Sequence, residues 1–190
     1  MSEQTYSERP IIFTGDSVRA IENDLKTQTR RVIPDDWWRC LDPEDAGDRA
    51  SALPQCPYGV AGDRLWVRET WRVPGDVGND RASTSRCTGP KDVQFKADGI
   101  EAPEWRPSMY MPRWASRLTL EIVSVRVERL QEIDRHDAIR EGVDPRDTPN
   151  PVARFCKSWD SINAKRGYPW SSNPWVWVIT FKRLGGGDAE

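Results

Sequence analysis

The sequence of 190 residues lacks a long apolar run. A membrane-spanning helix needs about 20 consecutive apolar residues, and no segment comes close to that length. Its opening, MSEQTYSERP, also lacks the basic and then apolar order of a secretory signal. We therefore expect a cytoplasmic protein with no membrane contact. No internal repeat is visible, and the length suits one domain, which we expect over 1–184 with a flexible tail over 185–190.

Closely spaced metal ligands are also missing. The four cysteines form no CxxC pair, and the chain has one histidine, His136. Structural zinc sites usually contain such close pairs, so the sequence suggests no metal and no other cofactor. We expect reduced thiols instead, as is usual in a cytoplasmic protein. The cysteines are Cys40, Cys56, Cys87 and Cys156.

An excess of positive charge is absent as well, since the formal net charge is −2. Broad binding to duplex DNA needs many cations that neutralise phosphates, so this composition argues against it. A local basic pocket for a nucleoside, a base or a short piece of RNA remains open. The chain has ten tryptophans, and most of them should lie in the core because indoles bury a large area. One or two near a pocket could stack on a base.

The first half of the chain alternates short regular segments with long irregular ones. The spacing of apolar residues predicts a helix over 16–26, and TQTRRVI at 27–33 reads as extended. Residues 34–61 are rich in Pro, Asp and Gly and look like a long loop. A Gly-Asp turn opens a predicted strand at 62–71, and a second long loop over 74–107 contains one short candidate strand, VQFKA.

The second half has stronger signals. Apolar residues alternate along 117–131 and change phase once, which indicates a long strand with a β-bulge or bend. Helices are predicted at 134–142, with Asp134 as cap and Gly142 beyond its end, and at 151–166. A closing strand over 174–184 places four apolar side chains on one face: Trp175, Trp177, Ile179 and Phe181. The order predicts an α+β fold, a small and mostly antiparallel β-barrel with flanking short helices and two long loops.

These segments together resemble the ASCH domain of the PUA-like superfamily. The resemblance rests on a short helix followed by Lys-Thr-x-Thr-x-Arg, a GD-L-V strand, a long strand leading into a short acidic helix, and an aromatic C-terminal strand. The phrases CPYGVAGDRLWVRETW, MPRWASRLTLEI and WDSINAKRGYPWSSNPWVWVITFKR are similar to the phage- and prophage-encoded branch. The similarity covers roughly residues 9–184, and it implies a PUA-like barrel.

Within that family, the resemblance to small bacterial enzymes that hydrolyse N4-acetylcytidine implies a catalytic site. A lysine, a threonine three residues later and a glutamate of the acidic helix act together in those enzymes. The matching residues here are Lys26, Thr29 and, in the segment Ala-Ile-Arg-Glu, Glu141. Without the resemblance, these three would pass for an ordinary strand start and a helix-end carboxylate.

Amide hydrolysis gives each of these residue types a task. A threonine hydroxyl needs a base to become a nucleophile, and a lysine can be that base if burial or nearby cations lower its pKa. Glu141 would protonate the leaving nitrogen or orient a water. In a second version Thr29 only positions substrate or water, and the sequence leaves both open. Strand alternation puts Thr29 and Arg31 on one face and Lys26 on the other, unless Lys26 sits at the helix-to-strand junction.

Five further residues are candidates for substrate binding. Arg31 is either a contact to a carbonyl or sugar or a surface cation. Glu69 either binds a base edge or forms a salt bridge to a neighbouring arginine, and Trp114 either lines the ligand groove or belongs to the core. The set is Arg31, Glu69, Trp71, Arg113 and Trp114. His136 lies five residues from Glu141, on a different side of its helix, and we expect it to be structural.

The sequence thus predicts a metal-independent amidohydrolase that removes the acyl group from N4-acylated cytidine or cytosine derivatives. One alternative is a non-catalytic module that binds a modified base or single-stranded RNA. Another is a ribonuclease, an activity reported for some ASCH-like proteins, although a lone histidine disfavours the usual mechanism with two histidines. The net charge of −2 favours a small ligand over a long RNA.

Overall fold

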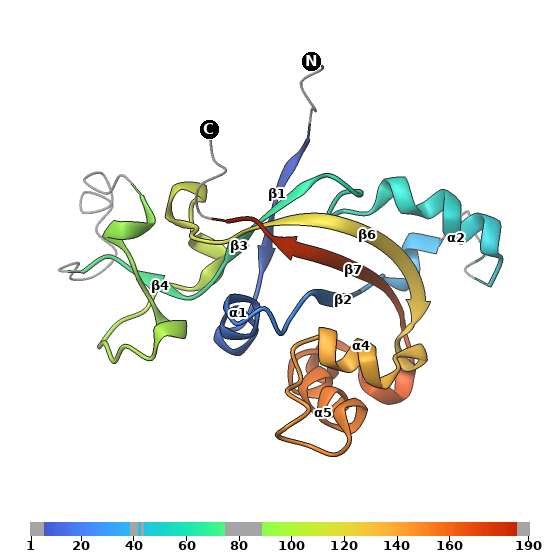
Figure 1. The fold of residues 1–190 in the computed structure, drawn as a ribbon. Helices are drawn as coiled ribbons and strands as arrows, with labels where there is room; N and C mark the ends of the chain where they lie inside the picture. The colour runs from blue at the N-terminus through green and yellow to red at the C-terminus, as the bar shows by residue number, and fades with distance from the viewer. Residues whose placement is uncertain (1–5, 39–41, 43, 75–88, 186–190) are drawn as a thin grey trace.

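The computed structural model describes residues 6–38, 42, 44–74 and 89–185. A five-stranded mixed sheet runs through it in the order β1-β3-β6-β7-β2, and a two-stranded ladder pairs β4 with β5 (Figure 1). The strands of the larger sheet are β1 (Glu8–Ile12), β2 (Gln28–Val32), β3 (Arg64–Arg68), β6 (Thr119–Arg129) and β7 (Trp175–Arg183). The ladder joins β4 (Trp71–Arg72) and β5 (Gln94–Phe95). Three of the four pairings in the large sheet are antiparallel, and β1–β3 is parallel.

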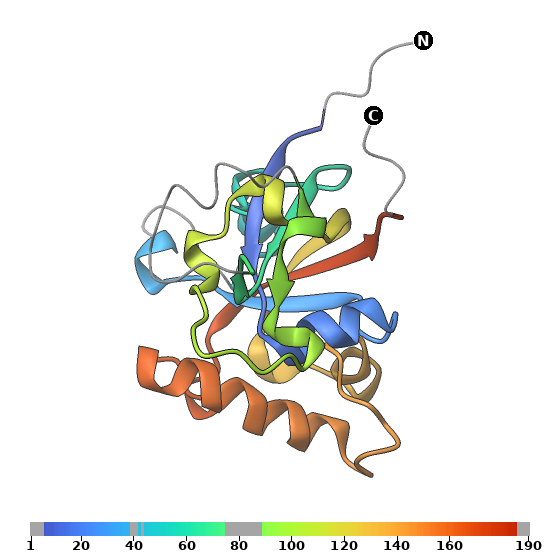
Figure 2. The same cartoon turned by 90° about the vertical axis from the view of Figure 1, so that its left-hand side faces the viewer.

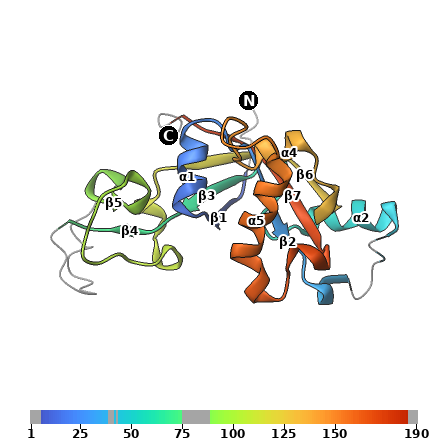
Figure 3. The ribbon, with the colours of Figure 1, turned by 90° about the horizontal axis from the view of Figure 1, so that it is seen from below.

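Three helices border the large sheet. They are α1 (Gly15–Glu22), α4 (Arg135–Arg140) and α5 (Pro151–Asn163), and α5 runs below the sheet in Figures 1 and 2. Helix α1 packs into the apolar cluster on one face of β7, and α4 and α5 pack into the cluster on its other face. The view from below shows the β4–β5 ladder projecting at one end of the molecule (Figure 3). The fourth helix, α2 (Ala46–Ala52), lies at the other end of the molecule.

The prediction of an α+β fold is confirmed, whereas a closed barrel is not seen among the described residues. In their strand pairing β1 and β2 are the two edges of an open sheet. What joins these edges is a side chain, because Nη2 of Arg31 on β2 donates to the Ile12 carbonyl of β1 at 2.7 Å. The edges therefore approach each other without a backbone ladder.

Strand β7 organises the core because both of its faces are buried. Its alternate residues from Trp175 to Phe181 pack into the main apolar cluster with β1, β3 and β6, as the sequence predicts. Val176 and Val178 point the other way, into a second cluster with Phe155 and Trp159 of α5. Burial of such side chains contributes about 1.5–3 kcal/mol each, so β7 anchors the helices to the sheet.

The predicted phase change in the long strand is confirmed as a β-bulge. The pairing of β6 with β7 shifts between Ile122 and Ser124. Leu120 and Ile122 before the bulge and Val125 beyond it therefore pack on the same cluster, while Val123 is exposed. The extra residue bends β6 over the sheet, which is the usual effect of a bulge.

Two sequence predictions need correction. Residues 34–61 are not a continuous loop, because they include α2, whose N-cap Asp45 accepts a hydrogen bond from the Asp48 backbone N–H. In addition, no strand is predicted from the sequence at Glu8–Ile12, where the structure has β1. Part of the second predicted loop, 75–88, and the tail residues 186–190 lie outside the described residues.

Candidate functional site

Lys26 stands at the junction between α1 and β2. Helix α1 is capped by Thr14, and after its end Asp24 adopts a left-handed φ of 56°. The backbone N–H groups of Leu25 and Lys26 then both donate to the Ala20 carbonyl at 2.9 Å. This tight turn fixes the direction of Lys26 independently of the strand pleat, which resolves the conflict that alternation predicts.

Glu141 meets Lys26 from the end of α4. That helix begins at its N-cap Asp134 and ends at Glu141, and Gly142 follows with a φ of 98°. The cap and the glycine are those that the sequence predicts. The left-handed glycine turns the chain so that Glu141 forms an isolated β-bridge with Lys26. The two residues are thus held by backbone pairing as well as by their side chains.

The side chains of Lys26 and Glu141 form a buried ion pair. Nζ of Lys26 lies 2.9 Å from Oε2 of Glu141 and 2.7 Å from the Glu141 carbonyl oxygen. Both side chains are at most 5% exposed. The two residues are 115 positions apart in the sequence. Their contact brings Glu141 to the segment that contains Lys26 and Thr29, the other two residues of the predicted catalytic set.

Arg30 holds Glu141 from the other side. Its Nη1 lies 3.2 Å from Oε1 of Glu141, so the carboxylate is bound by one cation at each oxygen. Nη2 of Arg30 reaches Asp137 at 2.7 Å and Glu128 at 3.2 Å, and its side chain is fully buried. Arg126 contacts the same two carboxylates. This charged network fixes the orientation of Glu141.

The surroundings lower the pKa of Lys26. Burial is the largest cause, Glu141 opposes it, and the charges of Arg31 and Arg30 lower it further. A lysine with a lowered pKa is uncharged in a larger fraction of molecules, and only the uncharged amine accepts a proton. The direction of the shift is the one that a general base requires.

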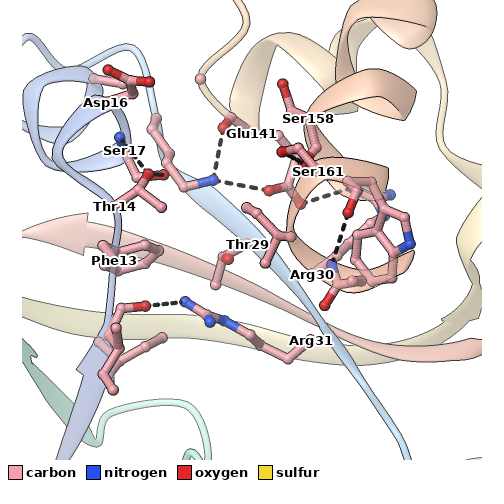
Figure 4. A pocket seen from close by; sticks show the side chains of 18 of the residues that line it. Phe13, Thr14, Asp16, Ser17, Thr29, Arg30, Arg31, Glu141, Ser158 and Ser161 are labelled. Atoms are coloured by element: carbon pink, nitrogen blue, oxygen red, sulfur yellow. Dashed lines mark hydrogen bonds and ion pairs between the residues drawn. The ribbon is translucent and has the colours of Figure 1, made fainter. Parts of the chain in front are cut away.

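Thr29 and Arg31 share one face of β2, as alternation predicts, and both line a cavity beside Lys26 (Figure 4). Thr29 is buried, and its hydroxyl forms no hydrogen bond within the described part of the chain. Arg31 packs its guanidinium against Phe13, 5.0 Å from the ring centre. The cavity therefore joins a lysine, a threonine, a glutamate and an arginine.

The cavity has a volume of about 860 Å³, within the range of small-molecule sites. Its walls come from the end of β1, α1, β2, the end of α4 and one face of α5. Helix α5 contributes hydroxyl groups from Ser158 and Ser161 (Figure 4), and the 3-10 turn that follows it, Ala164–Arg166, contributes the cation Arg166. Tyr58 closes another side. A polar ligand of nucleoside size has both room and hydrogen-bond partners here.

The other four predicted binding residues lie away from this cavity. Glu69 is buried against Arg117, with contacts of 2.9 and 3.1 Å, and burial raises its pKa although Arg117 lowers it. Trp71 and Trp114 pack edge to face at 6.0 Å in a third apolar cluster. Arg113 forms a bidentate ion pair with Glu8.

The structure thus gives these four residues structural contacts. The salt bridge that the sequence allowed for Glu69 exists, but its partner is Arg117 rather than an adjacent arginine. Trp114 belongs to a core cluster, which was the alternative to a role in the groove. None of the four lines the cavity that contains Lys26 and Thr29, although the sequence suggested a role in binding substrate.

Sequence reasoning missed the anchoring role of Arg30 and the contribution of α5. A signal for Arg30 existed, because strand alternation places it on the face opposite Thr29 and Arg31, which is the face of Lys26 four residues away. Its carboxylate partners Asp137 and Glu128 lie about a hundred residues further along, at separations of 107 and 98. Nothing local in the sequence indicates such partners.

Three further observations concern the residues that the structure describes. Within them no group of three or more His, Cys, Asp or Glu side chains is arranged to hold a metal ion. His136 is exposed on α4. Across residues 6–38, 42, 44–74 and 89–185, no helix is both long and apolar enough to span a membrane.

Comparisons with known proteins add little. No protein-family model matches the sequence, and no curated protein matches it. A crystal structure of an Enterococcus faecalis protein, assigned to the family DUF984, is similar to this chain with a TM-score of 0.44 and 10% sequence identity. The match covers 96% of this chain and 82% of that one. At this level the likeness supports no conclusion about function.

Proposed function

We propose that this chain is an amidohydrolase of the ASCH type that removes the acyl group from N4-acylated cytidine or cytosine derivatives without a metal. The observation that carries the proposal is the buried contact of 2.9 Å between Lys26 and Glu141, beside Thr29 in one cavity. The PUA-like barrel is part of the same proposal, with β1 and β2 as the edges that approach each other.

In the proposed reaction the three residues act one after another. Uncharged Lys26 takes the proton of the Thr29 hydroxyl, and the oxygen attacks the acyl carbon. The proton passes from Lys26 to Glu141 over their contact of 2.9 Å. Glu141 then protonates N4, the C–N bond breaks, and cytidine departs. The acyl group remains as an ester on Thr29, and water hydrolyses this ester. In the second version water attacks directly and Thr29 only positions it.

A binding module for a modified base is the second candidate. The cavity favours it to the extent that its hydroxyl and guanidinium groups suit base and sugar recognition whether or not a bond is broken. The two candidates differ in one observable, the release of cytidine. A ribonuclease would instead cleave RNA that carries no acyl group.

The test follows cytidine release from N4-acetylcytidine by the parent protein and by Lys26→Ala, Glu141→Ala, Thr29→Val and Thr29→Ser. We expect losses of about 10²–10⁴-fold for the first three, because each removes a proton-transfer or nucleophilic group. Lys182→Ala removes an exposed lysine that pairs with Glu121, and it serves as the matched control. Circular dichroism of each variant confirms folding.

Two outcomes would overturn the proposal. One is the absence of release at high enzyme concentration across several acyl sizes. The other is release that survives in Lys26→Ala. The two versions of the reaction are separated by mass spectrometry during turnover, since an acetyl group on Thr29 appears only if its hydroxyl is the nucleophile. Retained activity in Thr29→Ser with loss in Thr29→Val supports a chemical role for that hydroxyl.

A further inference from the structure

The cavity has a positive charge that the proposed reaction does not use. Its lining contains five basic and two acidic side chains, although the whole chain has a net charge of −2. Of the two acids, Glu141 is bound by Lys26 and Arg30, and Asp16 pairs with Arg19 at the exposed end of α1. Neither acid is available to neutralise the rest of the lining.

Three arginines of the lining have no carboxylate partner among the residues that the structure describes. Arg68 packs on Trp66 and donates to the Met109 carbonyl, and Arg166 donates to Asn163. Arg31 and Arg68 are both half-buried, and each has a buried Nε with no partner in the described part of the chain. Nη2 of Arg31 donates to the Ile12 carbonyl.

Arg31 packs against two aromatic rings and lines the same cavity as Arg166. Phe13 and Tyr58 flank its guanidinium at 5.0 and 5.9 Å. Burial lowers the pKa of Arg31, Tyr58 and Glu141 oppose the shift, and the charge of Arg166 lowers the pKa again. Two cations that line one cavity, whose acids are already paired with other cations, favour an anion as ligand.

We propose that Arg31 and Arg166 form a subsite for the phosphate monoester of a nucleotide, so that the substrate is an N4-acylated cytidine nucleotide rather than the nucleoside. This inference rests on the proposed function for the identity of the base. Arg31 lies two residues from Thr29 on the same strand face, about 7 Å along the strand. A ligand with its amide at Thr29 can therefore reach Arg31 with its sugar phosphate, since both residues line the same cavity.

The test measures binding of the reaction product by isothermal titration calorimetry, which does not depend on catalysis. We expect CMP to bind the parent about tenfold or more tightly than cytidine, because one charge-assisted hydrogen bond accounts for that factor. The advantage should shrink as salt rises, and inorganic phosphate should compete with CMP. Arg31→Gln and Arg166→Gln should each remove most of the advantage.

Arg146→Gln is the control, because Arg146 is exposed and pairs only with Asp144 within the described residues. Equal affinities for CMP and cytidine in the parent would overturn the subsite, as would equal effects of Arg166→Gln and Arg146→Gln. Arg166 is exposed, so its variant should fold even if Arg31→Gln does not. Much tighter binding of a short oligocytidylate than of CMP would replace the mononucleotide by RNA.

The same experiments separate failure of this inference from failure of the proposed function. Hydrolysis of N4-acetylcytidine without any advantage of CMP over cytidine refutes the phosphate subsite and leaves the amidohydrolase intact. An advantage of CMP that depends on Arg31 and Arg166, without hydrolysis of either acylated compound, refutes the enzyme and leaves a nucleotide-binding site.

Discussion

Replacing Arg30 by methionine tests whether the buried network around Arg30 stabilises the fold through its charges rather than through packing. Arg30 contacts Glu141, Asp137 and Glu128 at 3.2, 2.7 and 3.2 Å, and its side chain has no exposed surface. Removing one partner of a buried ion pair leaves the other charge uncompensated, at a cost of about 3–5 kcal/mol. We expect Arg30→Met to lose about that much free energy of unfolding in urea, or roughly 6–20 °C in Tm.

Arg140→Met provides the matched control, because Arg140 contacts the same carboxylate, Asp137, at 3.5 Å from a side chain that is 56% exposed. An exposed pair of this kind contributes at most about 1 kcal/mol. The structure therefore predicts a large difference between two arginines that share one partner. A loss in Arg30→Met no larger than in Arg140→Met would refute the reasoning.

The pH dependence of the Arg30→Met effect distinguishes charge from packing. Burial raises the pKa of Asp137, but hydrogen bonding and charge from Arg30, with Arg126, outweigh it and hold the pKa below its usual value. A carboxyl with a lowered folded pKa stabilises the fold above its unfolded pKa, and that stability is lost as pH falls through the folded pKa. The difference between parent and variant should be complete at pH 7 and shrink below about pH 4. A difference that is constant over this range would mean lost packing.

Two further predictions concern Lys26 and its surroundings. Because burial lowers the pKa of Lys26, kcat/KM for N4-acetylcytidine should rise with pH and level off well below the usual lysine pKa of about 10.4. An apparent pKa at or above that value would exclude Lys26 as a base with a lowered pKa. Gly142→Ala should lose about 1–3 kcal/mol more unfolding free energy than Gly167→Ala, because its new Cβ would lie 3.1 Å from Cβ of Lys26 and of Ala20. Both glycines have positive φ, yet no atom lies within 4 Å of a Cβ at Gly167, so equal losses in urea unfolding would refute the predicted contact.

Much of the second half of the fold could be predicted because its signals are local. Alternation in β7, the phase change in β6, and the cap and glycine around α4 each depend on residues within one or two turns of chain. In β7 a single period-two pattern describes both faces, with aromatic residues on one and Val176 and Val178 on the other. In β7 the residues of both faces are buried in the core clusters, so local pattern and tertiary packing agree.

The elements that the sequence did not reveal depend on distant partners or lack an apolar pattern. Strand β1 reads ERPII and is ordered by parallel pairing with β3, some 56 residues away from Glu8 to Arg64. Helix α2 reads AGDRASA, with a glycine and few apolar residues, and it is recognisable mainly through its Asp45 cap. Neither segment has an apolar periodicity or a secondary-structure propensity strong enough to predict it among the surrounding Pro and Gly residues, which indicate a loop.

The site divides in the same way. Thr29 and Arg31 followed from alternation along one strand, whereas Lys26 required a turn that only the Asp24 and Ala20 backbone defines. The pairing of Lys26 with Glu141 followed from the resemblance, since no local pattern links residues 115 apart. Glu69 had the local appearance of a site residue, a carboxylate among aromatic and basic neighbours, yet its partner Arg117 neutralises it. Which charged residues share the cavity therefore depends on contacts between distant segments, and only the three-dimensional arrangement determines those.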